Sequence, residues 1–254
     1  MRLGQAQHSP RAQYVLLSLA GCAGRMGALI RTILGRHQHA KLVAPLAMSG
    51  ECRRMAPGPC AIRARHADAR TIGASDAVVD FSRPRCTMLY LRCAAALRSR
   101  MVIGTTGLCQ CEASYARTAA QRIGILMSAN TSVGVTLFRM LCSYAARLYA
   151  GYDFGIVEVH HRHKRDVPSG TAIALRHCVA STQHGVSICS LRGGGVVGDH
   201  AVFVLGESDV VVIEHRSTTR LHFATGAVEA AVRLCSIGNG LYDMQGVLGL
   251  STAP

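Results

Sequence analysis

The sequence predicts an α/β protein with two domains: a parallel sheet covered by helices, followed by an α+β domain with a mixed or antiparallel sheet. Two observations support this fold class. Up to residue 129, apolar runs of strand length alternate with segments of helical spacing. Beyond residue 130, one long helical segment precedes several short strand-like runs joined by turns. A length of 254 residues suits one large domain or two modest ones.

The first half alternates strands with helices, which favours a parallel sheet with helices on both faces. Glycines separate the first strand from the first helix, and a Gly, Pro and Arg-rich connection spans 49–70. The expected strands are 14–20, 42–48, 77–81, 101–103 and 123–127. The expected helices are 28–34, 86–97 and 112–122.

The second half has a different rhythm, with helices expected at 133–149 and 170–180. The strands expected there are 154–159, 187–191, 201–205, 209–216 and 221–223. Residues 240–250 are too short to form a unit alone, so we expect them to pack on one of the two domains.

Composition excludes several classes of protein. With 49% hydrophobic and 17% charged residues, the chain is not of the disordered type. No apolar run approaches the roughly 18 residues of a membrane-spanning helix. The net charge of +14 comes from scattered arginines with few aromatics, which favours an anion-attracting surface over nucleic-acid binding. Eleven cysteines without a Cys-x-x-Cys pair indicate reduced thiols, and we expect a cytoplasmic protein.

Glycines 21, 24 and 27 lie between the first strand and the first helix. Such a turn lets the backbone approach a pyrophosphate at a helix N-terminus. The alternative is a glycine-rich turn that only packs tightly. Arg25 favours the phosphate site, because it places a permanent cation inside the turn.

Two further loops follow strands and are expected to face the same crevice. Residues 104–107 read Gly-Thr-Thr-Gly, and two glycines with two hydroxyls suit contact with a flat ring or an amide. Residues 128–131 follow the next strand. A plain strand-to-helix turn is the alternative for the first loop.

The densest polar cluster is Glu-Val-His-His-Arg-His-Lys at 158–164, at the end of a predicted strand. It fits a metal site, an acid/base site or a solvated basic loop. A metal site is the weakest of these, because adjacent histidines on a strand point apart. A histidine with a lysine four residues later suits proton donation beside an anion. The loop at 166–171 opens a helix, and its N–H groups and hydroxyls can hold a carboxylate.

Seven motifs then occur in order: Gly-x-x-Gly-Arg-Met-Gly (21–27), Asp-Phe-Ser-Arg-Pro (80–84), Gly-Thr-Thr-Gly (104–107), Asn-x-Ser-Val-Gly (130–134), Glu-x-His-His-Arg-His-Lys-x-Asp-x-Pro-Ser-Gly-Thr (158–171), Gly-Asp-His (198–200) and Gly-Leu-Tyr-Asp-Met (240–244). Together they resemble the dihydrodipicolinate reductase family, the 4-hydroxy-tetrahydrodipicolinate reductases of bacterial lysine and diaminopimelate synthesis. The resemblance spans nearly the whole chain.

This resemblance implies a Rossmann-type dinucleotide-binding domain over 1–129 and 236–254, and a substrate-binding and oligomerisation domain over 130–235. The implied reaction is hydride transfer from NADH or NADPH to a cyclic imine dicarboxylate, which forms from 4-hydroxy-tetrahydrodipicolinate by loss of water. The implied assembly is a homotetramer, with no nucleic-acid or membrane partner. The electron-rich enamine that hydride addition leaves needs an acid and a cation nearby.

The resemblance also assigns residues. His160 takes the family's proton-donor position, with Lys164 as the partner cation. The residues implied to bind the substrate carboxylate are His161, Ser169, Gly170 and Thr171. The residues implied to bind the cofactor are Gly21, Gly24, Arg25, Met26, Gly104, Thr105, Thr106, Ser128, Ala129, Asn130 and Thr131. No metal is expected.

Three departures from the family pattern keep a non-catalytic dinucleotide-binding relative as the alternative. Ala47 and Met48 stand where the family places an acidic residue, often followed by arginine, so coenzyme preference is unreadable. Thr131 replaces an aromatic residue expected near the nicotinamide. The segment 181–197 is shorter than usual.

Overall fold

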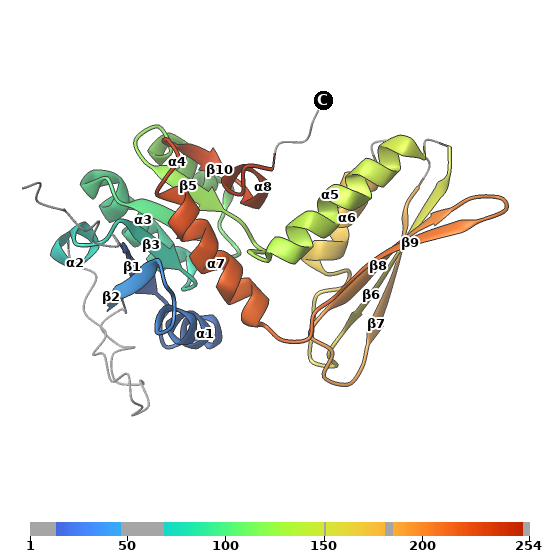
Figure 1. Cartoon of the computed structure of the whole chain (residues 1–254), viewed down its shortest axis with the longest axis horizontal. Helices are drawn as coiled ribbons and strands as arrows, with labels where there is room; N and C mark the ends of the chain where they lie inside the picture. The colour runs from blue at the N-terminus through green and yellow to red at the C-terminus, as the bar shows by residue number, and fades with distance from the viewer. Residues whose placement is uncertain (1–13, 47–68, 150, 181–184, 251–254) are drawn as a thin grey trace, which may run out of the picture.

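The computed structural model describes residues 14–46, 69–149, 151–180 and 185–250, and its two sheets lie in separate halves of the molecule (Figure 1). The first sheet has parallel strands in the order β10-β5-β4-β3-β1-β2. These are β1 (Val15–Ala20), β2 (Ala40–Leu46), β3 (Ala77–Asp80), β4 (Arg100–Ile103), β5 (Gly124–Met127) and β10 (Gly240–Tyr242). The predicted parallel sheet is confirmed, and the C-terminal segment contributes its edge strand β10.

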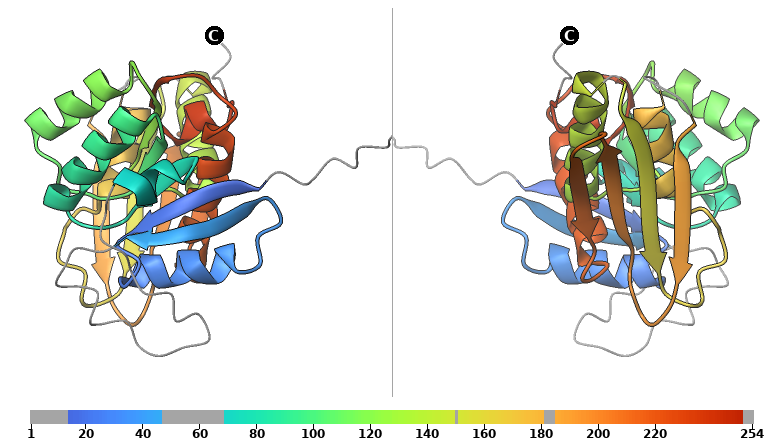
Figure 2. Two further views of the ribbon diagram at one scale, coloured as in Figure 1. Left: turned by 90° about the vertical axis from the view of Figure 1, so that its left-hand side faces the viewer. Right: turned by 90° about the vertical axis from the view of Figure 1, so that its right-hand side faces the viewer.

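Helices cover both faces of this sheet (Figure 2). Because successive strand side chains point to opposite faces, Val79 and Val102 belong to one apolar layer while Val78 and Ile103 belong to the other. The first layer packs against α1 (Arg25–Leu34), α7 (Leu221–Leu234) and α8 (Met244–Val247). The second packs against α2 (Ala69–Gly73), α3 (Pro84–Leu97) and α4 (Gln110–Ala119).

The second sheet is mixed, as predicted, in the order β7-β6-β8-β9. Its strands are β6 (Asp153–His160), β7 (Ser187–Arg192), β8 (Asp199–Leu205) and β9 (Val210–Arg216), and only the β6 and β7 pair is parallel. One face packs against α5 (Val133–Leu148) and α6 (Gly170–Val179). Alternate residues of β6 are buried, from Phe154 to His160, so Glu158 and His160 lie on the same side of the strand.

Residues 221–234 differ from the prediction in both structure and position. A short strand was expected at 221–223 within the second domain, but these residues begin the 14-residue helix α7. Ala224, Val228 and their neighbours on the buried face pack into the core of the first sheet. The strand prediction considered only the first three residues, and the alanines that follow favour helix. The chain therefore returns to the first sheet at α7, before residue 236.

None of the helices in the described ranges combines the length and apolar character that a membrane-crossing segment needs.

Gly226 generates a test of how α7 packs against the connection into α5. A Cβ at this position would lie 1.8 Å from the carbonyl oxygen of Thr131, which is backbone and cannot rotate away. We expect Gly226→Ala to lower the free energy of unfolding by about 1–3 kcal/mol, because overpacking displaces one of the two segments. Urea unfolding measures the change.

Gly73→Ala is the matched control, since its Cβ would come no closer than 3.8 Å to the flexible side chain of Leu97. Unchanged stability of Gly226→Ala would contradict the close packing of α7.

Candidate functional site

A cavity of about 500 Å³ lies between the two domains. One wall comes from the loops after β4 and β5, at the carboxyl ends of parallel strands, where open α/β sheets bind ligands. The opposite wall comes from the end of β6, the loop after it and the first turn of α6. The predicted site residues on these walls are Thr106, Ser128, Ala129, Asn130, His160, His161, Lys164, Ser169, Gly170 and Thr171.

A second cavity, of about 270 Å³, adjoins the start of α1 and shares Ala129 with the first. Arg25, Met26, Gly104 and Thr131 line it, as do residues outside the prediction. The structure therefore divides the predicted residues between two adjoining spaces. Most of the predicted cofactor set borders the space beside α1 or the wall formed by the loops after β4 and β5.

The glycine turn between β1 and α1 has no room for side chains. Gly21 has a φ of +74°, and a Cβ there would lie 2.3 Å from the carbonyl oxygen of Phe81. Gly24 is the N-cap of α1, with no side-chain hydrogen bond to the helix. The first N–H groups of α1 are thus available to an anion, with the Arg25 cation beside them.

A buried carboxylate, that of Asp80, holds two loops together beneath the small cavity. It accepts hydrogen bonds from the hydroxyls of Ser82, Thr87 and Thr105. Thr105 was predicted to contact the cofactor, but its hydroxyl is taken up by Asp80 and by the backbone N–H of Ser82. Thr105 therefore shapes the loop from within, while the next residue, Thr106, faces the large cavity.

The crossing between the domains is also hydrogen-bonded. The amide of Asn130 reaches the hydroxyl of Thr171 on α6 at 3.5 Å, so one predicted cofactor residue touches one predicted substrate residue. The hydroxyl of Thr131 donates to the carbonyl oxygen of Phe223 at 2.6 Å. Thr131 is thereby directed into α7, although it also borders the small cavity.

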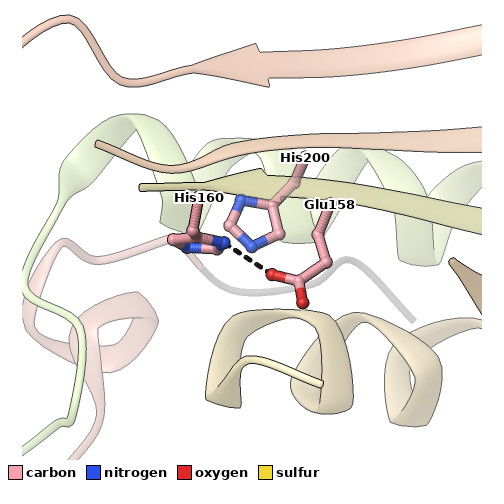
Figure 3. A group of neighbouring side chains, drawn as sticks. All are labelled: Glu158, His160 and His200. Atoms are coloured by element: carbon pink, nitrogen blue, oxygen red, sulfur yellow. Dashed lines mark ion pairs between the residues drawn. The ribbon is translucent and has the colours of Figure 1, made fainter. Parts of the chain in front are cut away.

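His160 ends β6 with its ring almost completely buried. Its Nδ1 lies 2.6 Å from Oε2 of Glu158, and its ring stands edge-on to His200 with centroids 5.1 Å apart (Figure 3). Burial lowers the pKa of His160, and the cations Lys164 and Arg192 act in the same direction, whereas the charge of Glu158 opposes them. The group therefore releases its proton more readily than a free histidine.

The first turn of α6 is the segment for which the sequence predicts a carboxylate cradle. Ser169 is the N-cap and accepts the N–H of Ala172 at 3.1 Å, and its hydroxyl also lies 3.1 Å from Nε2 of His200. The N–H groups of Gly170 and Thr171 have no partner within the helix. Together with the helix dipole they favour an anion.

Two cationic side chains, Lys164 and Arg220, also line this cavity. Nζ of Lys164 pairs with Asp166 at 2.8 Å, and that carboxylate is largely exposed. Desolvation and then the charge of Arg220 lower the pKa of His161. The field in the cavity is therefore positive, which suits a ligand with two negative charges.

Glu158, His160 and His200 are also the one group of three potential metal ligands within the described ranges, and one ligand atom of each lies within 4.8 Å of the others. Arg192 already neutralises Glu158, and Ser169 already bonds His200. The trio fits a proton-holding network better than a metal site.

Sequence reasoning missed Arg220 and Phe223, which line both cavities from the start of α7. It also missed Arg139 of α5, on the wall of the large cavity. The alanine-rich sequence of 221–234 could have revealed Arg220 and Phe223, because it predicts a helix that begins beside Arg220. Ala47 and Met48 lie outside the described residues, as do residues 181–184 of the shortened segment 181–197. Two later residues of this segment do contact the site: Arg192 bonds to Glu158, and Val197 lines the large cavity.

His200 predicts a specific dependence of stability on pH. Burial, and then the nearby His160, lower the pKa of His200 to about 4, whereas an unfolded histidine titrates near 6.5. The unfolded chain therefore binds a proton that the native state refuses, and stability falls as the pH drops from about 6.5 to 4. Between pH 7 and pH 4.5, the free energy of unfolding of His200→Asn should therefore fall by roughly 2 kcal/mol less than that of the parent protein.

Urea unfolding at both pH values measures this difference. The comparison removes the contribution of all other titrating groups. An identical pH dependence in the two proteins would show that His200 is not held neutral.

The arrangement agrees with the comparisons to known proteins. Residues 15–131 match the model of the N-terminal domain of dihydrodipicolinate reductase, and residues 134–248 match that of its C-terminal domain. The 4-hydroxy-tetrahydrodipicolinate reductases of Nitrosomonas eutropha and Bordetella pertussis are each 36% identical over 92% of this chain, and cover 98% and 97% of their own lengths.

Among solved structures, a dipicolinate-bound dihydrodipicolinate reductase from Paenisporosarcina sp. TG-14 superposes with a TM-score of 0.78. It is 21% identical, and the match covers 91% of this chain and 98% of that one. At this identity the superposition supports the fold, while the sequence matches define the family. The chain belongs to the dihydrodipicolinate reductase family.

Proposed function

We propose that this protein is a 4-hydroxy-tetrahydrodipicolinate reductase that uses NADH or NADPH to form tetrahydrodipicolinate for lysine and diaminopimelate synthesis. One observation carries the proposal beyond family membership. The proton-donor candidate His160, the cation Lys164 and the N-terminus of α6 line a single interdomain cavity, opposite the loops after β4 and β5. A dicarboxylate in this cavity would face an acid, cations and free N–H groups together.

The residues beside α1 fit a dinucleotide. The glycine turn leaves the first N–H groups of α1 uncapped, and Arg25 supplies a cation for the pyrophosphate. A Cβ on Gly104 would lie 2.3 Å from the ring of Phe81, so the wall is flat and close at the place proposed for the nicotinamide. When bound, the reduced nicotinamide supplies a hydride.

The chain's own residues would then bind and protonate the substrate. Lys164, His161 and the N–H groups of Gly170 and Thr171 hold a carboxylate at the α6 end of the cavity. After hydride addition the substrate is an electron-rich enamine. The Nε2–H bond of His160 breaks, its electron pair stays on nitrogen, and the proton joins the enamine carbon.

The departure at Thr131 favours the alternative of a non-catalytic dinucleotide-binding relative, because this segment places no aromatic ring at the cavity. Phe81 and Phe223 border the same space and supply apolar rings there. The intact proton-donor wall supports an enzyme. The eleven cysteines, without a Cys-x-x-Cys pair, suit a reducing compartment, so we place the protein in the cytoplasm.

The outer face of the second sheet supports the proposed homotetramer. Leu191, Leu205, Val210 and Val212 are exposed, and they come from β7, β8 and β9. The register places Phe203 opposite Val212 and Leu205 opposite Val210, so these four side chains form one patch. A patch of this kind on a sheet is typical of a buried interface.

The direct test of the reductase is an assay with enzymatically generated 4-hydroxy-tetrahydrodipicolinate and either NADH or NADPH. We expect substrate-dependent oxidation of at least one coenzyme. His160→Gln should lower kcat by about 10²–10⁴, the range for loss of a general acid, and leave coenzyme affinity unchanged. His163→Gln is the matched control, because His163 is exposed in the same loop.

Coenzyme binding without turnover in the parent protein would favour the non-catalytic relative. An unchanged kcat in His160→Gln would place the proton donor elsewhere.

The assembly is tested by light scattering after size-exclusion chromatography. The parent protein should have about four times the chain mass of 27.0 kDa. Val212→Asp introduces charge into the proposed interface and should give smaller species, whereas Val43→Asp, at an exposed valine of β2, should not. A tetramer that survives Val212→Asp would contradict this interface.

A further inference from the structure

Glu158 is a charged residue with no exposed surface, at the heart of the site but without contact to the cavity. It stands on β6 two residues before His160, so both side chains point to the same side of the sheet. A buried carboxylate is costly unless it is paired and hydrogen-bonded. Replacing a buried ion pair by well-packed apolar residues generally leaves a protein at least as stable. The presence of a charge at this position therefore points to a role other than stability.

The two oxygens of this carboxylate have different partners. Oε1 accepts hydrogen bonds from Nη2 of Arg192 at 2.8 Å and from the N–H of Ser169 at 3.2 Å. Oε2 lies 2.6 Å from Nδ1 of His160, which is ion-pair distance, and neither of these two atoms has a hydrogen-bond partner in the described structure. One carboxylate thus connects the proton donor with the N-cap of the carboxylate cradle.

The ring of His160 is held in one orientation. Nδ1 is buried against Glu158 (Figure 3). A Cβ on Gly198 would lie only 2.8 Å from Nε2, so the loop before β8 packs closely on this end of the ring. Because Nδ1 is buried against Glu158 while His160 lines the cavity, Nε2 is the nitrogen left to exchange a proton with a ligand there.

The charges around His160 are otherwise unfavourable to its protonated form. Lys164 from the loop after β6 and Arg192 from β7 are both cations, and His200 from β8 packs edge-on. Asp166 is largely exposed and already paired with Lys164. Hydrogen bonds from its neighbours, among them Arg192 and Ser169, outweigh burial and lower the pKa of Glu158 to about 2, so this carboxylate stays ionised. Glu158 is the buried anion that opposes the cations.

We propose that Glu158 is a positioning residue for proton transfer: it keeps the proton of His160 on Nδ1, stabilises the imidazolium and joins the proton donor to the carboxylate cradle through Ser169. This inference rests on the proposed function for its catalytic consequence. The effect on His160 itself does not depend on turnover. In the transfer, the proton leaves Nε2, and a neutral imidazole remains that keeps its other proton on Nδ1, beside Glu158.

The test measures the pKa of His160 by NMR titration of ring-labelled histidine, with the signal assigned through His160→Gln. In Glu158→Gln the imidazolium loses its anion, and we expect this pKa to fall by about 1 unit or more. In Arg192→Gln a neighbouring cation is lost, and the pKa should rise. A purely structural network would not move the two variants in opposite directions.

The same variants are then compared by kinetics. Because His160 must be protonated to act, activity is lost as pH rises through its pKa. The descending limb of kcat/KM should therefore begin at lower pH in Glu158→Gln, with kcat at pH 7.5 reduced about tenfold or more for a shift of one unit. NADH affinity, measured by fluorescence, should stay within about twofold. Glu158→Asp keeps the charge at shorter reach and should restore part of both shifts.

Glu229→Gln is the matched control. Glu229 also pairs with a histidine, His37, at 3.3 Å, but this pair lies on α7 and the segment after α1, away from the cavity. It should change neither the pKa of His160 nor the pH profile. An unchanged pKa of His160 in Glu158→Gln, or shifts of the same sign in both variants, would overturn the proposal.

If Glu158→Gln fails to fold, the pKa of His160 in Glu158→Asp and Arg192→Gln decides, since the expected shifts are opposite there too. If the parent protein shows no reductase turnover, the proposed function fails, while the NMR titration still accepts or rejects the positioning of His160.

Discussion

The carboxylate of Glu158 has no exposed surface, so each of its oxygens must find a donor or a cation inside the protein. Arg192 and the N–H of Ser169 satisfy one oxygen, and His160 faces the other. These partners come from β7, from the N-cap of α6 and from the end of β6. A single buried charge thereby fixes the relative positions of the proton donor and the anion-binding helix end.

The first domain also contains a buried carboxylate that organises the segments around it. Asp80 is buried at the end of β3 and gathers the hydroxyls of Ser82, Thr87 and Thr105. It shapes the loops beside the smaller cavity without facing that cavity itself. In both domains, buried carboxylates preorganise the backbone groups that face a ligand, and the ligand meets cations and N–H groups.

Local sequence patterns predicted the fold and most of the residues at the site. Strand and helix alternation predicted the parallel sheet, and the motifs placed His160, Lys164 and Thr171 in one site, which the structure brings to one cavity. The sequence patterns did not reveal contacts between residues that are distant in sequence. The inward hydroxyl of Thr105 depends on Asp80, and the position of Phe223 depends on α7 returning to the first sheet. No local spacing reveals such tertiary contacts, although the alanines of α7 did signal a helix.

Burial and the cations Lys164 and Arg192 lower the pKa of His160, so a dianion that enters the cavity and offsets these cations should raise this pKa and favour proton uptake. Calorimetric titration of dipicolinate into the NADH-saturated protein, in buffers of different ionisation enthalpy, measures this proton directly. At pH 7.5 we predict net proton uptake on binding, lost in His160→Gln. Binding without proton uptake, or uptake that survives His160→Gln, would show that the protonation of His160 is not coupled to the charge of the ligand.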